Sequence, residues 1–424
     1  MRRALGLVGW IAACEPAPVD EVDPEPVCSA APGVICTWIG LFGQAHFGVE
    51  GAHRLDSGLY SPIDGTFGPD GRFYFIDYNN NRVRVLEDDE TVTTISGIGF
   101  LGDGPEGDAL AFSWNRPTDL AFDPADDTRL LVAAWGNSRI GEIDLAAGTA
   151  RFVCGTGTRG FGGDGGPATS AILEMPSSLA FSRDGAYLFM DQLNHLIRRV
   201  DAEGTITTYA GVVETRAVDA DGDPTTELIS EVTKGWPGYA GDGGPVSEAR
   251  FYGYIGGAYE PSSRITIAGG RLYVADTLNH LIRVIDLEAG TIERFAGAVS
   301  ARAWDHDQWS GTPEVVETRG WPGYGGDGGD RLDAAFNGPT DVEVDVDGSV
   351  FVADTSNHCV RKIDPTGIVT TVAGMCGQPG GEGDGGPATE AKLYRPSGIA
   401  LAPNGDLVIA DTANHVFRVV HRGE

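Results

Sequence analysis

One short stretch of sequence recurs along the chain and constrains the fold more than any other feature. The copy "VADTSNHCVRKID" begins at Val352, and copies with the same order of residue types begin at Phe75, Phe189, Val274 and Ile409. A sixth, degraded copy from Val132 has Ala134 in place of the aspartate and Gly141 in place of an arginine. A pattern that occurs six times along a chain indicates a repeat architecture before it indicates a site.

Each copy extends into four apolar runs of strand length that are separated by turn residues. In the last complete copy these runs begin at Pro339, Ser349, Cys359 and Ile368, and "VDG", "TSN" and "PTG" stand between them. No run keeps the period of a helix for more than about a turn. The sequence therefore predicts an all-β fold, a six-bladed β-propeller with four antiparallel strands in each blade.

The two ends of the repeat region complement each other. The last copy ends after three strands, whereas the strand-like segment "VICTWIG" from Val34 precedes the first copy. We expect this N-terminal strand to complete the last blade, which would leave no free sheet edge between the first and last blades.

The recurring residues resemble the NHL-repeat family of propellers, which is named for an Asn-His-Leu triplet. That triplet stands here as Asn194-His195-Leu196 and Asn279-His280-Leu281, and the resemblance covers roughly residues 34–424. It implies the propeller fold without specifying a function. Members of the family serve as binding platforms, as extracellular sensors or adhesion domains, and in one branch as a metal-containing peptidyl-hydroxyglycine lyase.

The repeated polar residues are interpreted as structural. Each aspartate can accept hydrogen bonds from turn backbone, and the asparagine after it tolerates the left-handed conformation. The equivalent histidines, which a packing or hydrogen-bonding role explains better than a metal ring, are His195, His280, His358 and His415. The Gly-rich segment "GDGGPATSA" and its echoes recur at blade-to-blade crossings and lack the Lys-Ser/Thr of a phosphate loop.

Two long insertions set two of the crossings apart from the others. They span residues 212–240 and 298–325 and share a "GWPGY" motif. We expect both on one face, beside the fourth blade, where they present Trp236, Tyr239, Trp321 and Tyr324 as ligand contacts. The alternative is that these aromatic residues hold the insertions against the blades.

Acidic residues alternate within both insertions. They are Asp219, Asp221 and Asp223 in the first insertion and Asp305 and Asp307 in the second. Such oxygen-rich segments suit Ca²⁺, although the spacing is not that of an EF-hand. No other cofactor is indicated, and the alternative is solvated surface charge.

A further series of residues varies at the start of the first strand of each blade. Two residues after the proline, the chain has Asp64, Asp119, Ser178, Ser263, Asp341 and Gly398. Because the innermost strands line the central channel, we expect Asp64, Asp119 and Asp341 at its mouth, where they could hold a cation or a polar ligand. The alternative is that each aspartate caps its own turn.

The amino terminus has the order of a bacterial lipoprotein signal. Residues 1–14 read "MRRALGLVGWIAAC", which predicts a signal peptide with lipidation of Cys14, and residues 15–33 form a Pro-rich, acidic tether. Glu15 after the cysteine resembles the signal for outer-membrane sorting. The net charge of −31 argues against nucleic acid and anionic lipid as partners, so we expect membrane contact only through the lipid anchor.

Export permits disulfide bonds among the remaining cysteines. The strand directions of the fifth blade bring Cys359 and Cys376 to the same end of adjacent strands, which predicts a bond between them. The pairing of Cys28, Cys36 and Cys154 stays open, and no spacing suggests a zinc site.

These features favour a surface-anchored, monomeric binding or scaffold propeller over an enzyme. Its ligand would be a protein, peptide or carbohydrate held on the face that bears the insertions. The alternative is a metal-dependent hydrolase or lyase with a site in the central channel, similar to gluconolactonase-like or peptidyl-hydroxyglycine lyase-like propellers. No Ser-His-Asp or paired-Glu arrangement stands out to support catalysis.

Overall fold

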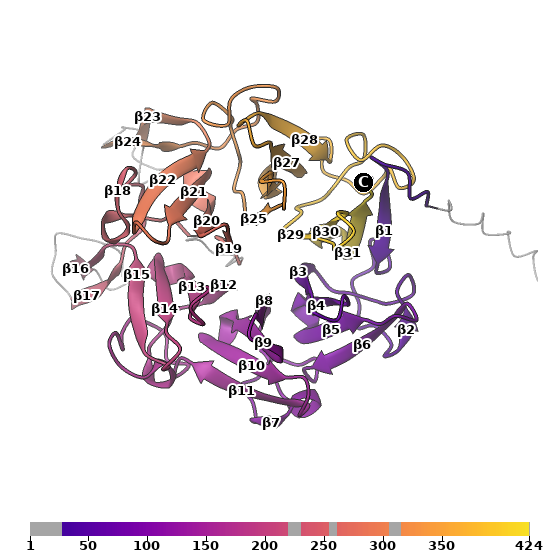
Figure 1. Cartoon of the computed structure of the whole chain (residues 1–424), viewed down its shortest axis with the longest axis horizontal. Helices are drawn as coiled ribbons and strands as arrows, with labels where there is room; N and C mark the ends of the chain where they lie inside the picture. The colour runs from indigo at the N-terminus through magenta and orange to yellow at the C-terminus, as the bar shows by residue number, and fades with distance from the viewer. Residues whose placement is uncertain (1–27, 219–229, 254–260, 305–314, 424) are drawn as a thin grey trace, which may run out of the picture.

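Six antiparallel sheets are arranged as blades around a central axis (Figure 1). The computed structural model describes residues 28–218, 230–253, 261–304 and 315–423. Within these ranges the regular elements are β-strands and one-turn 3-10 helices. No helix in this part of the chain is long and apolar enough to cross a membrane. The predicted all-β, six-bladed architecture is confirmed.

The strands of the first three blades follow in chain order. Blade 1 consists of β3 (Pro62–Phe67), β4 (Phe73–Asp77), β5 (Arg82–Leu86) and β6 (Thr91–Ser96), with the short β2 (Ala52–His53) beside β6. Blade 2 consists of β8 (Pro117–Asp123), β9 (Asp126–Ala134), β10 (Arg139–Asp144) and β11 (Thr149–Cys154), with β7 (Gly107–Asp108) beside β11. Blade 3 consists of β12 (Pro176–Phe181), β13 (Tyr187–Asp191), β14 (Leu196–Val200) and β15 (Ile206–Ala210).

The other three blades repeat this order until the ring closes. Blade 4 consists of β19 (Ile265–Ala268), β20 (Arg271–Asp276), β21 (Leu281–Asp286) and β22 (Thr291–Ala296), with β18 (Gly244–Pro245) beside β22. Blade 5 consists of β25 (Asp341–Val344), β26 (Val350–Asp354), β27 (Cys359–Ile363) and β28 (Val369–Ala373). Blade 6 consists of β29 (Gly398–Leu401), β30 (Leu407–Asp411), β31 (Val416–Val420) and the N-terminal β1 (Ile35–Ile39).

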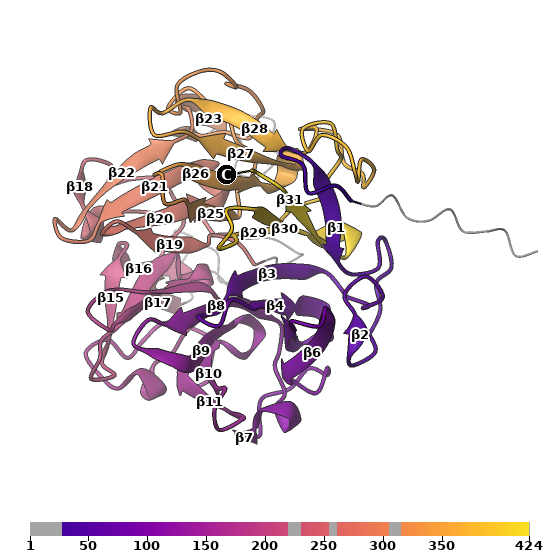
Figure 2. The ribbon, with the colours of Figure 1, turned by 45° about the vertical axis from the view of Figure 1, so that its right-hand side comes forward.

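The N-terminal strand closes the ring as predicted. β1 pairs antiparallel with β31, with Ile35 opposite Val420 and Thr37 opposite Arg418, and Figure 2 shows the two strands side by side. Ile35 and Ile39 are fully buried. The last blade therefore contains strands from both ends of the described chain, and unfolding of β1 would expose the apolar side of β31.

Two faces of the ring differ in the connections they carry. We name the crossing face after the blade-to-blade crossings; it also carries the 3-10 turns that follow the second strand of each blade, for example η8 (Thr355–Asn357). The turn face, on the opposite side, carries the two hairpin turns of each blade. Two additional hairpins leave the crossing face, β16–β17 (Val213–Val218 and Ser230–Gly235) and β23–β24 (Val299–Trp304 and Val315–Gly320).

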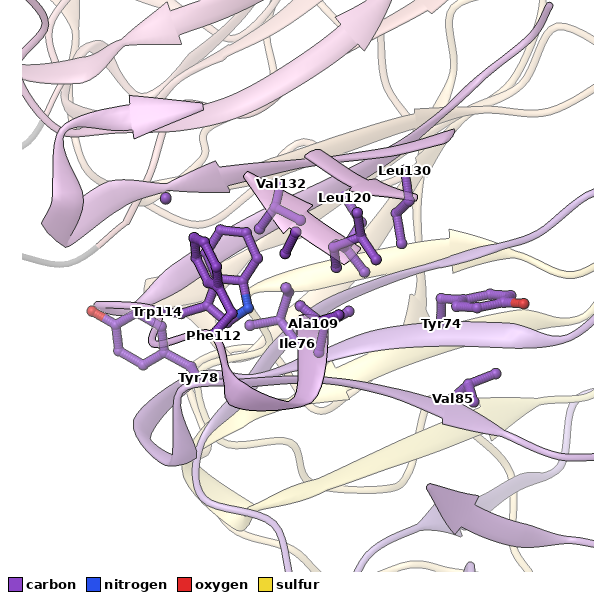
Figure 3. Packing of buried hydrophobic residues seen from close by; sticks show 14 of the residues in the cluster. Tyr74, Ile76, Tyr78, Val85, Ala109, Phe112, Trp114, Leu120, Leu130 and Val132 are labelled. Atoms are coloured by element: carbon purple, nitrogen blue, oxygen red, sulfur yellow. The ribbon is translucent and has the colours of Figure 1, made fainter. Parts of the chain in front are cut away.

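The hydrophobic core is divided among the six interfaces between blades. The second strands β4, β13, β26 and β30 are buried at every position, because both faces of each sheet pack on a neighbouring blade. This two-sided burial explains why these strands are apolar runs rather than alternating patterns. At the interface of blades 1 and 2, the clustered residues include Ile76, Leu120 and Val132 around Trp114 (Figure 3).

The interface in Figure 3 also explains the degraded repeat. A Cβ atom at Gly141, where the repeat has arginine, would lie 2.5 Å from ring atoms of Trp114. The indole of Trp114 thus occupies the space that the arginine side chain fills in other blades, and its Nε1 donates to Ser96 Oγ at 2.9 Å. Because Ala134 replaces the partner aspartate as well, no buried charge is left unpaired there.

Candidate binding site in the central channel

The aspartate, asparagine and arginine of the repeat form one buried network in each of five blades. In blade 5, Asp354 accepts hydrogen bonds from the Asn337 amide and from Asn357 Nδ2, both at 2.8 Å. Arg361 lies 3.5 Å from Asp354 and 2.6 Å from Asp327 of the Gly-rich crossing. Burial raises the pKa of Asp354 to about 7. These polar groups bond to one another and to the backbone within the repeat, which supports their structural interpretation.

The repeated histidines connect neighbouring blades. His280 adopts the left-handed conformation with φ of 54°, and its Nδ1 accepts a hydrogen bond from the Gly338 amide at 2.9 Å. His415 does the same for Ser61 across the ring closure. Burial lowers the pKa of His280 to about 4, so the ring is neutral and Nδ1 is free to accept. In blade 1, Asn81 takes this position and accepts from the Arg116 amide.

The tryptophans of the two insertions are buried at the bases of the extra hairpins. Trp236 is 4% exposed, donates to the Glu214 carbonyl and lies against the side chains of Arg216 and Lys234. Trp321 is 9% exposed and donates to the Ser300 carbonyl. Both indoles thus contact their own hairpins, whereas the alternative in the sequence analysis had the aromatic residues hold the insertions against the blades.

The tyrosines of the same motif cover buried arginines. Tyr239 packs on Arg283 and hydrogen-bonds Asp242, and Tyr324 packs on Arg361. Phe161 covers Arg198 in the same way in a crossing that has no insertion. The two tyrosines therefore belong to the repeat rather than to its exceptions, although Tyr324 remains 54% exposed.

The other predicted sites divide between described and undescribed residues. Asp219, Asp221, Asp223, Asp305, Asp307 and Cys14 lie outside the residues that the structure describes. Disulfides join Cys359 to Cys376 and Cys28 to Cys36, with Cα atoms 5.0 and 6.0 Å apart. Cys154 is a buried free thiol, and its burial raises its pKa to about 12.

The channel positions form a ring whose fourth member differs from our prediction. Asp64 lies opposite Ile76 and Asp341 opposite Ala353, but in blade 4 the residue opposite Ala275 is Arg264. The prediction of Ser263 was wrong because the first hairpin of this blade, which turns through Gly269 and Gly270, is one residue shorter and shifts the register. The ring therefore contains Asp64, Asp119, Ser178, Arg264, Asp341 and Gly398.

Arg264 spans the centre of this ring. Its Nη1 lies 2.5 Å from Asp64 and 3.7 Å from Asp341, and its Nη2 donates to the carbonyls of Ile63 and Thr118 at 2.9 Å. The arginine is 3% exposed and Asp64 is 6% exposed. Burial raises the pKa of Asp64 well above its usual value, while the charge of Arg264 opposes that change. One side chain from blade 4 thus reaches the backbone of blades 1 and 2.

Gly398 makes the space for this guanidinium group. A Cβ atom at this position would lie 2.3 Å from the Ile63 carbonyl oxygen and 2.8 Å from Arg264 Nη1. The sixth member of the ring therefore has no side chain, because its neighbours occupy that volume.

Two of the ring carboxylates also connect blades. Asp119 accepts from the amides of Leu120 and Leu179, and Asp341 accepts from those of Val342 and Ile399. The sequence analysis predicted a ligand role for these residues at the mouth of the channel, with capping of their own turns as the alternative. The observed contacts give each of them a structural role within its own blade and toward the next one.

A cavity of about 490 Å³ occupies the channel beside this ring. Its lining runs from the ring residues to Phe67, Phe181 and Leu401, which lead into hairpin turns, so the cavity lies between the ring and the turn face. The next channel-facing positions are small, except for one, and comprise Thr66, Ala121, Ala180, Thr266, Glu343 and Ala400.

Glu343 is the exception in this second layer. Its side chain is half-buried and has no ion-pair partner within the described part of the chain. Burial and the nearby Asp341 and Asp119 raise its pKa well above the usual value. Sequence reasoning missed Glu343, although it follows Asp341 by two positions on one strand, and that alternation directs both side chains into the channel.

The described residues contain no cluster of three or more His, Cys, Asp or Glu side chains arranged to hold a metal ion. The three carboxylates of the ring, Asp64, Asp119 and Asp341, instead contact Arg264 or backbone amides. Within the described residues, carboxyl, guanidinium and hydroxyl groups line the channel cavity, as they do in pockets that bind polar ligands.

Comparison with known sequences accounts for the repeat. The sequence model of the teneurin NHL domain matches residues 32–241, and that of the NHL repeat matches residues 336–363 and 393–419. The chain belongs to the NHL-repeat family. This NHL propeller is 26% identical over 335 residues to Protein SUPPRESSOR OF QUENCHING 1, chloroplastic, of Arabidopsis thaliana, and 26% identical over 423 residues to Teneurin-1 of Gallus gallus.

These relatives are much longer proteins. The matches cover 78% and 93% of the NHL propeller but only 27% and 14% of the two relatives. Among solved structures, an auxiliary nutrient binding protein and a putative phosphatase, both from Bacteroides thetaiotaomicron, superpose with TM-scores of 0.58 at 14% identity. Each match covers 91% of the NHL propeller and 75% or 78% of the other chain. The likeness shows the fold, and the two different names show that the fold alone does not decide function.

Proposed function

We propose that this NHL propeller is a non-catalytic binding protein that holds a small polar ligand in its central cavity. One observation carries the proposal: the cavity is lined by polar side chains that do not repeat, whereas the repeated polar side chains are hydrogen-bonded to one another. A scaffold is specified by what recurs, and a site by what differs.

The dimensions and position of the cavity support this function. Its volume of about 490 Å³ lies within the range of about 300–1,000 Å³ that is common for small-molecule sites. Arg264 and the ring separate the cavity from the crossing face, so a ligand would enter from the turn face. The nutrient-binding name of one structural neighbour is consistent with such a role for this fold.

Variants that fill the cavity test the proposal. Thr66→Trp and Thr266→Trp place an indole in the second layer of the channel, and Thr215→Trp, on the exposed hairpin, is the control. Melting temperatures are measured with panels of monosaccharides, amino acids and small amines. Binding by the wild type and the control, but by neither filled variant, is expected. Equal stabilisation of all four proteins would refute a cavity site.

A second candidate function uses the crossing face to bind a protein, peptide or carbohydrate. Its support is a group of exposed apolar residues on two adjoining crossings, where Phe47 is 46%, Phe100 71% and Leu101 59% exposed. The rings of Phe47 and Phe100 lie 6.4 Å apart. Exposed apolar groups of this kind mark binding surfaces when they are contiguous.

Peptide and glycan arrays test this second function. Phe100→Ser with Leu101→Ser is expected to abolish array binding, whereas the cavity variants keep it. Retention of binding by the double variant would show that Phe100 and Leu101 are not part of the binding surface.

We further propose that the protein is exported and anchored at a membrane surface through lipidated Cys14. The order of residues in "MRRALGLVGWIAAC" supports it. Cys14→Ser should lose metabolic labelling by fatty acid and move from the membrane to the soluble fraction. A labelled, membrane-associated variant would contradict the anchor.

A further inference from the structure

Resting on the proposed function, we infer that the central cavity recognises a hydroxylated organic amine, with Glu343 binding the ammonium group and Arg264 donating to a ligand oxygen. The inference therefore names the chemical class of the ligand and the two side chains that select it.

The charges of the cavity leave Glu343 as the group that requires a cation. Arg264 lies within ion-pair distance of Asp64 and Asp341. Asp119 accepts from two backbone amides. Within the described part of the chain, Glu343 has no ion-pair partner and does not accept from two backbone amides. The nearby Asp341 and Asp119 repel its negative charge. Without a cation the neutral form of the Glu343 carboxyl group is favoured, and a ligand ammonium group would favour the carboxylate and pair with it.

Arg264 supplies a second and different requirement. Its Nη1 atom is buried and carries two N–H groups, of which the ion pair with Asp64 at 2.5 Å uses one. The guanidinium group lines the cavity and is 3% exposed. A buried N–H group without an acceptor is costly, and a hydroxyl or carbonyl oxygen of a ligand would satisfy it.

The walls between these two groups suit an organic molecule better than an ion. Thr66, Thr266 and three alanines leave room for a molecule the size of a monosaccharide and offer hydroxyl groups to it. Ca²⁺ takes about six to eight oxygen ligands. The oxygens of Asp119 and Asp341 already accept backbone hydrogen bonds, so the cavity does not offer that set.

The test uses three sugars of one shape and different charge: glucosamine, glucose and glucuronate. Calorimetric titration at neutral pH of the full chain should show that glucosamine binds at least about tenfold more tightly than glucose, because its ammonium group pairs with the Glu343 carboxylate where glucose offers only an uncharged hydroxyl donor. Glucuronate should bind most weakly. Glucose binding equal to glucosamine binding, preference for glucuronate, or no binding of any of the three would overturn the inference.

Glu343→Gln removes the charge with little change of shape. It should reduce glucosamine affinity at least about tenfold and reduce glucose affinity by a smaller factor. Glu203→Gln, an exposed acid on the same face, is the matched control and should bind as the wild type does. Undiminished glucosamine binding by Glu343→Gln would contradict the role of Glu343.

These outcomes separate the inference from the proposed function. If neutral sugars bind as well as glucosamine and Thr66→Trp abolishes their binding, the proposed cavity-binding function holds and the inference of an amine ligand is refuted. The comparison of sugars on the wild type gives a result even if Glu343→Gln does not fold.

Discussion

Arg264 Nη1 lies 2.5 Å from Asp64 Oδ1, which joins blade 4 to blade 1 across the channel. The innermost strands of these blades are not sequence neighbours, and the contact does not recur in the repeat. It closes the channel toward the crossing face and gives the cavity a charged boundary.

Gly398→Ala should destabilise the protein because its Cβ atom would displace the guanidinium group or the Ile63 carbonyl. Overpacking of this kind costs about 1–3 kcal/mol. Urea unfolding followed by tryptophan fluorescence measures the loss. Gly162→Ala is the control, since the nearest atom to its Cβ would be 3.7 Å away. A similar small effect of both substitutions would show that the channel can relax around an added methyl group.

His280→Asn should flatten part of the acid dependence of stability. The folded pKa of His280 is about 4, below the usual 6.5, so the stability it contributes is complete above pH 6.5 and is lost as the pH falls toward 4. Between pH 7 and pH 5 the wild type should lose up to about 2 kcal/mol more unfolding free energy than the variant. Asn81 fills the same position in blade 1, so the fold should persist. Parallel stability curves for the two proteins would mean that the histidine is not buried neutral.

Removal of β1 should reduce stability far more than removal of the residues before it. Deleting residues 15–40 takes away the pairing with β31 and the buried Ile35 and Ile39, whereas deleting residues 15–30 keeps them. Thermal melting of both truncated proteins decides the point. The shorter deletion also removes Cys28, so Cys28→Ser in the full chain serves as its control. Identical melting of the two truncations would contradict ring closure by β1.

Alkylation in denaturant without reduction should label neither Cys359 nor Cys376. Both are bonded in the structure, with Cα atoms 5.0 Å apart at one end of β27 and the following crossing. Peptide mass analysis before and after reduction measures the labels, and Cys154 provides an internal positive control because it is a free thiol. Two labelled residues at positions 359 and 376 would exclude the bond.

Repetition made most of the scaffold predictable from sequence. Equivalents of Asp354, Asn357 and Arg361 recur with one spacing in five of the six copies, because these blades share the same turn and the same buried network, so the copies predict one local structure. Ring closure followed from a missing strand at one end of the repeat and a spare one at the other. Tyr239 and Tyr324 were misleading because an insertion beside them concealed their equivalence to Phe161.

By itself the sequence determined the blades, their number and their order. Strand periodicity and turn chemistry are local properties, and each copy of the repeat carries the same pattern. Only the tertiary structure decided which side chains meet in the channel. A one-residue difference in the blade 4 hairpin placed Arg264, and not Ser263, opposite Ala275, and curvature of the ring then brought it to Asp64 of blade 1. Such contacts depend on register and on closure of the whole ring, and neither is written in any single repeat.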